Sequence, residues 1–399
     1  MTDVVEAKAQ VSREEFLDRA RSLLPVLRER AAETERQRRV PQETIDEFVR
    51  LGLFRGLQPA RWGGLEVEPA TFYEAVATVA SGCVSSGWVL GVVGVHDWHV
   101  GLFPLQTQEE IWGKDGSVLI ASSYAPIGKV AHVKGGYRLS GRWSFSSGID
   151  PSEWVLTNSL VPEVGNPERR HGYTFVFPKS DLTVIDDWYV AGLQGSGSKT
   201  FVAEDIFIPE HRAIRLSDTR ALKTPGLEVN PSPLFRIPQM NIFLWAVSAP
   251  AVGAARGMLD LWREQGAKRI GTNPKAPLLS AHFAHENLAR ATSKVEAAGW
   301  RLRRDNEEML AMAEAGSSFP FEDRSRFRWG AAYAVDESVT AIDLLFEAAG
   351  GFAIQLENPM QRIFRDAHAI RVHAANNVKR AAASFGRVQL PLAEDDGTL

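Results

Sequence analysis

The stretch Phe364-Arg365-Asp366-Ala367-His368-Ala369-Ile370-Arg371-Val372-His373-Ala374-Ala375-Asn376 lies near the C-terminus of a chain of 399 residues. The charged pair Arg365-Asp366 follows Phe364, and no carboxylate follows Asp366 within the stretch. His373 can exchange protons near neutral pH. The methyl group of its neighbour, Ala374, cannot. The stretch therefore offers a histidine, and not a carboxylate, for acid–base chemistry at the end of a long helical region.

Hydrophobic periodicity predicts helices at both ends of the chain. From Leu234 to about Phe385 the pattern is helical, with loops at 271–277 and 316–321. At the other end, Ser12-Arg13-Glu14-Glu15 matches a capping box that starts a helix. Further helices are expected over about 42–51, 69–80 and 84–103.

Between these helical regions the chain is rich in short β-type runs. Gly135-Gly136 separates two alternating runs and predicts a hairpin. Helices, then strands, then helices indicate an α+β multidomain fold and not an alternating β-α order. We expect domains over residues 1–116, 117–226 and 227–399, with a loop at about 217–232. The runs that predict strands are 118–123, 130–133, 137–145, 154–160, 173–177 and 201–208.

The composition limits the possible partners. Hydrophobic residues make up 44% and charged residues 24%, as in soluble globular proteins. A net charge of −4 argues against nucleic acid as a partner. The single cysteine, Cys83, excludes an internal disulfide and fits a reducing cytoplasm as a small buried hydrophobe. We expect no signal peptide and no apolar run long enough to span a bilayer, hence no membrane association.

Several common catalytic motifs are absent from the sequence. There is no Walker loop, no Gly-x-Ser-x-Gly and no His-Glu-x-x-His. Gly195-Ser196-Gly197 precedes a predicted strand, so the dinucleotide fingerprint is missing as well. If the protein catalyses redox chemistry, a separate protein must use the nicotinamide cofactor.

Three local motifs resemble segments of the acyl-CoA dehydrogenase family. They are Gly141 with Phe145-Ser146-Ser147-Gly148, Gly192–Ser198 with Phe207-Ile208-Pro209, and Gly350-Gly351 with Phe364-Arg365-Asp366. The resemblance implies an N-terminal α-helical domain, a central β-barrel or sandwich, and a C-terminal four-helix bundle. Counting from Arg365-Asp366, the catalytic glutamate of dehydrogenases would fall at Ala374.

Within that fold, the chain is most similar to reduced-flavin-dependent, two-component monooxygenases. The stretches that carry this similarity include Trp62-Gly63-Gly64, Ser86-Gly87-Trp88, Val93–His99, Ser122–Pro126, Trp188–Leu193 and Val372–Asn376. The resemblance implies that FADH2 or FMNH2 reacts with O2 and that the resulting flavin hydroperoxide hydroxylates a bulky, seco-steroid-like phenol. It also implies an NAD(P)H:flavin reductase as partner and a homotetramer built as a dimer of dimers.

The resemblance also implies roles for individual residues. Ser147 would contact the flavin N5 and Ser122 would make a second contact, although strand serines can equally satisfy backbone groups. His373 would act either as a base near the substrate hydroxyl or, as imidazolium, as a proton donor to the departing oxygen. Trp88 and His96 are eight residues apart, about two helical turns, and would face the substrate.

Other candidates have an equally simple structural explanation. Tyr124 and Trp143 could bracket the flavin or the substrate, or pack in a core. Arg236, Arg269 and Lys268 could bind the flavin phosphate across a subunit contact, or be solvated charges. Gly350 and Gly351 would form a flavin-contacting turn. His96 and His99 could share a metal, but no carboxylate or cysteine has matching spacing, so we expect none.

Two alternative functions remain open from the sequence. One is an oxygenase of the same family that acts on indole or another fused heteroaromatic ring. The other is an acyl-CoA dehydrogenase or oxidase that keeps its base on another helix. Ala374 argues against the second alternative without excluding it.

Overall fold

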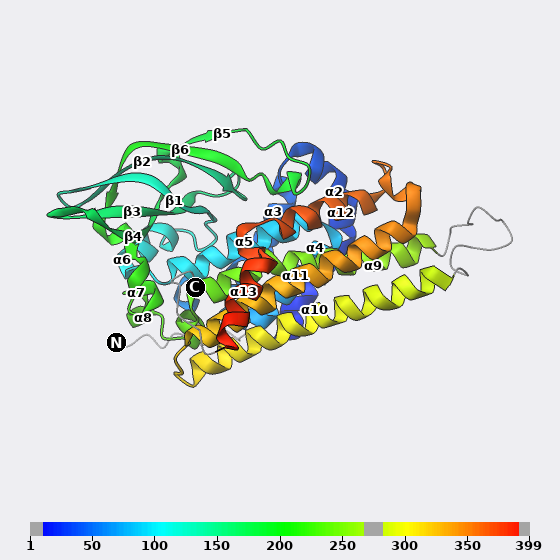
Figure 1. The fold of residues 1–399 in the computed structure, drawn as a ribbon. Coiled ribbons are helices and arrows are strands. Elements are labelled where there is room, and N and C mark those ends of the chain that lie inside the picture. The colour runs from blue at the N-terminus through cyan, green and yellow to red at the C-terminus, as the bar shows by residue number, and fades with distance from the viewer. Residues whose placement is uncertain (1–10, 267–281, 391–399) are drawn as a thin grey trace.

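Helices form both ends of the chain and strands form its middle (Figure 1). The fold is seen in a computed structural model that describes residues 11–266 and 282–390. At the start of α1, Ser12 Oγ accepts a hydrogen bond from Glu15 N at 3.2 Å, so the predicted helix start is confirmed. The N-terminal helices are α1 (Arg13–Ser22), α2 (Leu24–Gln37), α3 (Gln42–Arg50), α4 (Pro69–Gly82), α5 (Val84–Val100) and α6 (Leu105–Trp112).

The strands follow the order β5-β6-β2-β1-β3-β4-β7. β1 takes part in two sheets, because its start pairs with β3 in parallel and its end pairs with β2 antiparallel. Val133 pairs with Gly136 across Gly135, whose φ is +81°, so the predicted hairpin is confirmed. The strands are β1 (Ile120–Val133), β2 (Gly136–Ser146), β3 (Trp154–Glu163), β4 (Asn166–Pro178), β5 (Thr183–Ile185), β6 (Lys199–Pro209) and β7 (Ala213–Arg215).

The two halves of the sheet enclose an aromatic core that contains Trp143. The Trp143 side chain is fully buried and stacks on Phe201, with ring centroids 5.3 Å apart. Its Nε1 donates to Ala125 O at 3.0 Å. The prediction that Trp143 contacts the substrate is therefore wrong. The residue lies on the strand face that fills the β domain, and the flat ring is needed there to pack the two halves together.

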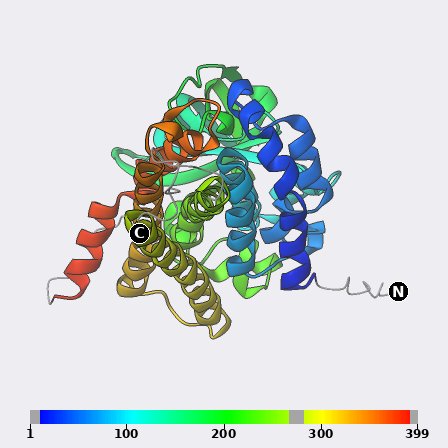
Figure 2. The ribbon, with the colours of Figure 1, turned by 90° about the vertical axis from the view of Figure 1, so that its right-hand side faces the viewer.

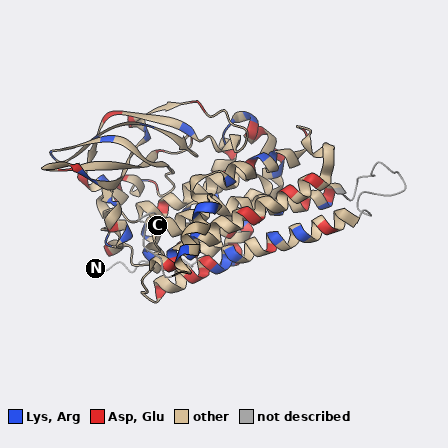
Figure 3. Cartoon of the chain, in the orientation of Figure 1, with Lys and Arg blue, Asp and Glu red and all other residues tan. Residues whose placement is uncertain are grey.

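Long helices dominate the C-terminal region, and α9 lies among them and the N-terminal helices (Figure 2). By length and composition α9 could cross a membrane, contrary to the sequence-based expectation, but most of its apolar window is buried inside the protein. Acidic and basic residues are interspersed along the outer helices α10 and α11 (Figure 3). The helices are α9 (Gln239–Gly266), α10 (His282–Glu314), α11 (Phe321–Ala349), α12 (Pro359–Arg371) and α13 (Val378–Val388).

The α+β class, with helical, β and helical regions in succession, is confirmed. Strands begin at Ile120 and end at Arg215. The segment expected to be a loop contains two short helices, α7 (Leu216–Arg220) and α8 (Gly226–Val229). Both helices follow β7, and α7 with the turn after it (Ala221 and Leu222) forms one wall of a cavity between the β domain and the C-terminal helices.

Candidate active site

A cavity of about 780 Å³ lies where α7, β1, α9, α11 and the turn after α12 meet. Its volume suits a substrate of drug-like size. Tyr124, Phe243 and Leu216 supply apolar surface, and His373 and Ala374 also line the cavity. Among the described residues that line the cavity there is no Asp or Glu. Four arginines line it instead, namely Arg220, Arg324, Arg328 and Arg380.

His373 lies at this cavity outside any α-helix. α12 ends at Arg371, and His373 is the N-cap of a 3-10 turn formed by Ala374–Asn376. Its Nδ1 accepts a hydrogen bond from Ala375 N at 3.3 Å. Desolvation by its surroundings lowers the pKa of His373 to about 4, so the ring is neutral at pH 7. A neutral ring that accepts through Nδ1 carries its proton on Nε2. His373 therefore presents a hydrogen-bond donor.

Two of the predicted residues, Trp88 and Ser147, lie beside His373. The Trp88 and His373 rings meet edge to face with centroids 5.6 Å apart. Trp88 Nε1 donates to Ser147 Oγ at 2.9 Å. Three side chains from α5, from the turn after β2 and from the turn after α12 thus form one group.

Phe145, two residues before Ser147, was not predicted from the sequence. Its φ is +65°, a conformation that is rare and costly for a bulky side chain. The ring is 72% exposed and meets Trp188 edge to face at 5.8 Å. Strain that keeps an aromatic ring outside the core is consistent with a ligand surface. Phe145, Trp188 and the half-buried Ser147 hydroxyl together suit a flat ring with a polar edge, such as a flavin.

His96 does not reach the cavity directly. It is buried, its Nδ1 lies 2.6 Å from Ile120 O, and its ring meets Tyr124 edge to face at 5.9 Å. His99 Nδ1 lies 2.7 Å from the Tyr124 hydroxyl. Desolvation lowers the pKa of His96 to about 4 and that of His99 to about 3, so both rings are neutral. Tyr124 stands between these histidines and the cavity.

The remaining predicted cofactor residues are not gathered at the cavity within one chain. Ser122 is half-buried on β1, two residues before Tyr124 and so on the same strand face. Arg236 is exposed beside α10. Gly350 and Gly351 are exposed beyond the end of α11, with open space where a Cβ would lie. For Arg236 and the two glycines, flavin contact stays a prediction that needs a second copy of the chain. Arg269 and Lys268 lie outside the described residues.

Within the described ranges, no group of three histidine, cysteine or acidic side chains is arranged to hold a metal ion. His96 and His99 instead find their partners in a backbone carbonyl and a tyrosine hydroxyl.

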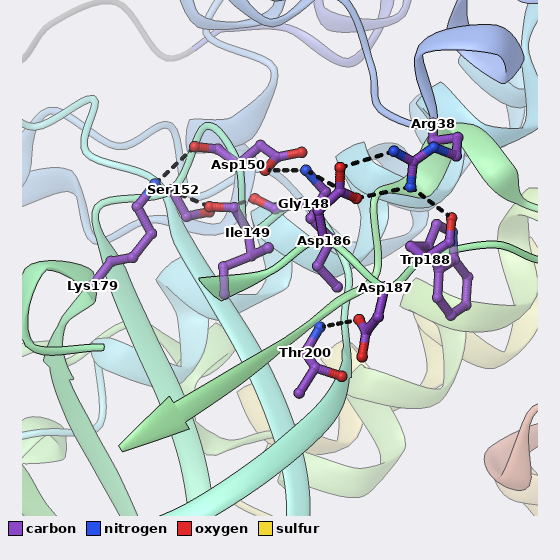
Figure 4. A network of polar contacts seen from close by, with 11 residues as sticks. Arg38, Gly148, Ile149, Asp150, Ser152, Lys179, Asp186, Asp187, Trp188 and Thr200 are labelled. Atoms are coloured by element: carbon purple, nitrogen blue, oxygen red, sulfur yellow. Dashed lines mark hydrogen bonds and ion pairs between the residues drawn. The ribbon is translucent and has the colours of Figure 1, made fainter. Parts of the chain in front are cut away.

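Ion pairs fix the loop between β5 and β6 against the turn after β2 (Figure 4). Arg38 donates to both carboxylate oxygens of Asp186 at 2.8 Å. Lys199 Nζ lies 2.9 Å from Asp150 Oδ1 in the turn and 3.8 Å from Asp186 Oδ1 in the loop, and Lys179 Nζ donates to the backbone oxygen of Asp150 at 2.7 Å. Because these contacts join the two segments, the position of Ser147 relative to the loop is well defined.

Asp366, on α12, forms a hydrogen bond with the same loop. It is buried, and its Oδ1 accepts a hydrogen bond from Leu193 N at 2.6 Å. Its neighbour Arg365 donates to Ala191 O at 2.6 Å. Desolvation raises the pKa of Asp366 to about 7. The Arg365-Asp366 pair in the opening stretch thus connects α12 to the loop between β5 and β6.

Asp366 should make the stability of the protein depend on pH. Its pKa is about 7 when folded and about 3.9 when unfolded. Between these values the folded state holds a proton on Asp366 that the unfolded state lacks, so the contribution of Asp366 to the free energy of unfolding should fall as pH rises from 4 to 7. His96, His99 and His373, whose pKa values are lowered, contribute in the opposite direction. Each pKa unit corresponds to about 1.4 kcal/mol. Asp366→Asn keeps an oxygen for Leu193 N but does not titrate, so from pH 5 to pH 7 its free energy of unfolding should fall less, or rise more, than that of the wild-type protein.

Urea denaturation of the flavin-free protein at pH 5 and at pH 7 would measure this difference. The exposed Asp181→Asn variant is the matched control and should follow the wild-type protein. An unchanged pH dependence in Asp366→Asn would show that this carboxyl group titrates normally.

Comparison with known proteins shows that the chain has the acyl-CoA dehydrogenase fold. Residues 12–112 match the acyl-CoA dehydrogenase N-terminal domain and residues 245–378 match the acyl-CoA dehydrogenase C-terminal domain. The crystal structure of the 3-HSA hydroxylase from Rhodococcus sp. RHA1 superposes with a TM-score of 0.91 at 40% identity, over 96% of this chain and 99% of that one. XiaF from Streptomyces sp., solved with FADH2 and glycerol, gives a TM-score of 0.87 at 27% identity, over 96% and 97%.

Relatives in sequence narrow the class further. The oxygenase subunit HsaA of a flavin-dependent monooxygenase from Rhodococcus jostii is 41% identical, over 93% of this chain and 97% of the relative. The oxygenase component of an FADH(2)-dependent resorcinol hydroxylase from Rhizobium sp. is 31% identical, over 94% of each. The chain belongs to the two-component, flavin-dependent aromatic monooxygenases of the acyl-CoA dehydrogenase fold. It is an oxygenase component that uses reduced flavin and O2, and a separate reductase supplies the flavin.

Proposed function

We propose that the chain hydroxylates a bulky phenol of the seco-steroid kind. The observation that carries this proposal is His373, a neutral Nε2–H donor on the wall of a cavity of about 780 Å³ without a lining carboxylate. Ala374, where a dehydrogenase would carry its base, lines the same cavity. A thioester dehydrogenase would therefore find a methyl group at that place.

The described residues fit a bound reduced flavin at the Phe145–Ser147 turn. Phe145 and Trp188 would hold the ring, and Ser147 would contact its N5. Reduced flavin bound here supplies the activation of O2. The protein's part is to keep water from the reacting atoms and to orient the phenol.

His373 would donate from Nε2 to the oxygen of a substrate that binds as its phenolate, having lost its proton to bulk water. Such a donor stabilises the negative charge on that oxygen, and a phenolate is more electron-rich than a phenol at the carbon to be hydroxylated. The sequence left two roles open for His373, proton acceptor or imidazolium donor. The hydrogen bond from Ala375 N to Nδ1 and the lowered pKa support a third role, in which the neutral imidazole is a hydrogen-bond donor.

Tyr124 would contact the substrate from the other side. Its hydroxyl bonds to His99, and its ring meets Phe243 edge to face at 5.4 Å. The arginines at the cavity wall have many N–H donors and suit a substrate that also carries carbonyl oxygens.

A comparison of substrates tests the assignment. With reduced flavin, O2 and matched concentrations, a bulky keto-substituted phenol should give at least about tenfold more product per reduced flavin than indole, which lacks the hydroxyl that His373 would bind. Product and hydrogen peroxide are both quantified, so that wasted oxygen is counted. A higher yield from indole would replace the phenol by the alternative heteroaromatic substrate.

We also propose a cytoplasmic homotetramer. Beyond α11 the side chains of Phe352, Ile354 and Leu356 are 43%, 67% and 77% exposed and adjoin Gly350-Gly351, which suits burial against another copy. Sedimentation of the purified chain gives the mass. A monomer at micromolar concentration would rule out this assembly.

A further inference from the structure

A continuous line of hydrogen bonds runs inward from Ser147. Trp88 Nε1 donates to Ser147 Oγ at 2.9 Å, and Ser147 Oγ lies 2.7 Å from Ser198 Oγ. Ser198 Oγ in turn lies 2.7 Å from Ser196 Oγ, which donates to Leu193 O at 2.7 Å. We call Ser147, Ser198 and Ser196 the serine line.

The direction of every hydroxyl proton in the serine line follows from its inner end. A carbonyl oxygen cannot donate, so the 2.7 Å contact between Ser196 Oγ and Leu193 O is a hydrogen bond only when the proton of Ser196 points to Leu193 O. Ser196 can then only accept from Ser198, and Ser198 can only accept from Ser147. Each hydroxyl has one proton, so the proton of Ser147 points inward.

The inner members of the serine line cannot easily turn toward water. Ser196 is 1% exposed and Ser198 is 4% exposed, whereas Ser147 is half-buried and faces the proposed flavin surface. Leu193 O also accepts from Trp188 Nε1 and from Ser196 N, each at 3.0 Å, and Leu193 N donates to the buried Asp366. A reversed line would leave Leu193 O with these two donors and would lose the hydrogen bond from the Ser196 hydroxyl, which is a cost of about 1 kcal/mol.

Ser147 therefore has no proton to offer outward. One of its two lone pairs accepts from Trp88, and the other remains available on the exposed side. We propose that the serine line makes Ser147 an acceptor only, and that the site thereby selects reduced flavin over oxidised flavin. This inference rests on the proposed contact between Ser147 and N5.

The selection follows from the chemistry of N5. Reduced flavin carries a hydrogen on N5 and can donate it to Ser147. Oxidised flavin has a lone pair there, which would meet the lone pair of Ser147 without a proton between them. An oxygenase component benefits from this difference, because it must take up reduced flavin from its reductase and release oxidised flavin after turnover. Ser198 and Ser196 are then positioning residues that act through Ser147.

Binding measurements with Ser198→Ala test the proposal without turnover. FAD and dithionite-reduced FADH2 are titrated into the full chain under argon, and the ratio of the two dissociation constants is compared with the wild-type ratio. Without Ser198, the Ser147 proton is free to turn toward oxidised N5. The preference for FADH2 should fall about tenfold, the equivalent of roughly one hydrogen bond. The midpoint potential of bound FAD should fall correspondingly by about 30 mV.

Two further variants serve as controls. Ser152→Ala removes a buried hydroxyl that donates to Gly148 O at 2.8 Å, in the same turn but outside the serine line, and should keep the wild-type ratio. Ser198→Thr retains a hydroxyl and should restore the preference. FMN and FMNH2 are titrated in the same way.

The outcomes separate the two proposals. If Ser147→Ala binds both flavin forms like the wild-type protein, the contact with N5 is absent and the flavin ring does not lie at the Phe145–Ser147 turn. If Ser147→Ala changes the ratio while Ser198→Ala keeps it, the contact exists but the serine line does not set the preference. A folded Ser198→Ala protein with an increased preference for FADH2 would overturn the assigned direction of the protons.

Discussion

The His373→Ala variant is expected to hydroxylate its phenol about 10² times more slowly than the wild-type enzyme, within the range for loss of one positioned proton-exchanging or donor group. Reduced flavin should still be consumed, because His373 is proposed to act on the substrate. Most of the oxygen should then appear as hydrogen peroxide. Single-turnover mixing with product analysis separates the two fates.

Two further substitutions distinguish donation from proton acceptance. His373→Gln keeps an amide N–H near the position of Nε2 and should retain part of the rate. His373→Glu supplies a base without a donor and should be as slow as His373→Ala. Rescue by glutamate and not by glutamine would assign His373 the role of base.

The pH dependence provides an independent check on His373. Because its pKa is about 4, the ring stays neutral between pH 8 and pH 6, and the hydroxylation rate should not fall there through this group. Its folded pKa lies below the unfolded value of about 6.5, so its contribution to stability is lost as pH falls toward 4. A rate that falls below pH 6.5 in the wild-type enzyme, but not in His373→Gln, would show that the ring titrates normally.

Ser147→Ala should make the enzyme waste oxygen. If Ser147 accepts the N5 hydrogen, its loss removes one hydrogen bond that favours the protonated form of the flavin, and peroxide should escape more readily. We expect the product formed per reduced flavin to fall about five- to tenfold, for a hydrogen bond of about 1 kcal/mol. Product and hydrogen peroxide are measured together with saturating phenol. Ser152→Ala is the matched control, and equal coupling in both variants would remove Ser147 from the reaction.

Much of the fold could be predicted because local signals agreed with each other. The capping box at Ser12, the hairpin at Gly135 and the succession of helices and strands were visible in the sequence. The sequence did not show that the two predicted strands 118–123 and 130–133 form a single strand, β1. β1 shifts register between Ser123 and Gly128, and such a bend depends on two different neighbouring strands and leaves no clear local pattern.

The site was predicted unevenly for a similar reason. Motifs selected Ser147, Trp88 and His373 as candidates, because each lies in a short segment with a distinctive composition, and the structure brings the three together. Trp143 was misplaced, since the two faces of a strand look alike when both carry aromatic and polar residues. Ser198 and Ser196 were not among the predicted site residues. Their role depends on Leu193 O, which is a backbone atom and has no signature in a sequence.

The cavity wall and the serine line are built from separate parts of the chain. Leu216, Leu222 and Phe243 face the cavity, and no member of the serine line is among the residues that surround it. An engineer could therefore diversify these three positions to admit new aromatic compounds while leaving the redox preference of the enzyme intact. Relatives of this enzyme can diverge in the same way, by exchanging the apolar residues of the cavity wall and so accepting new aromatic substrates.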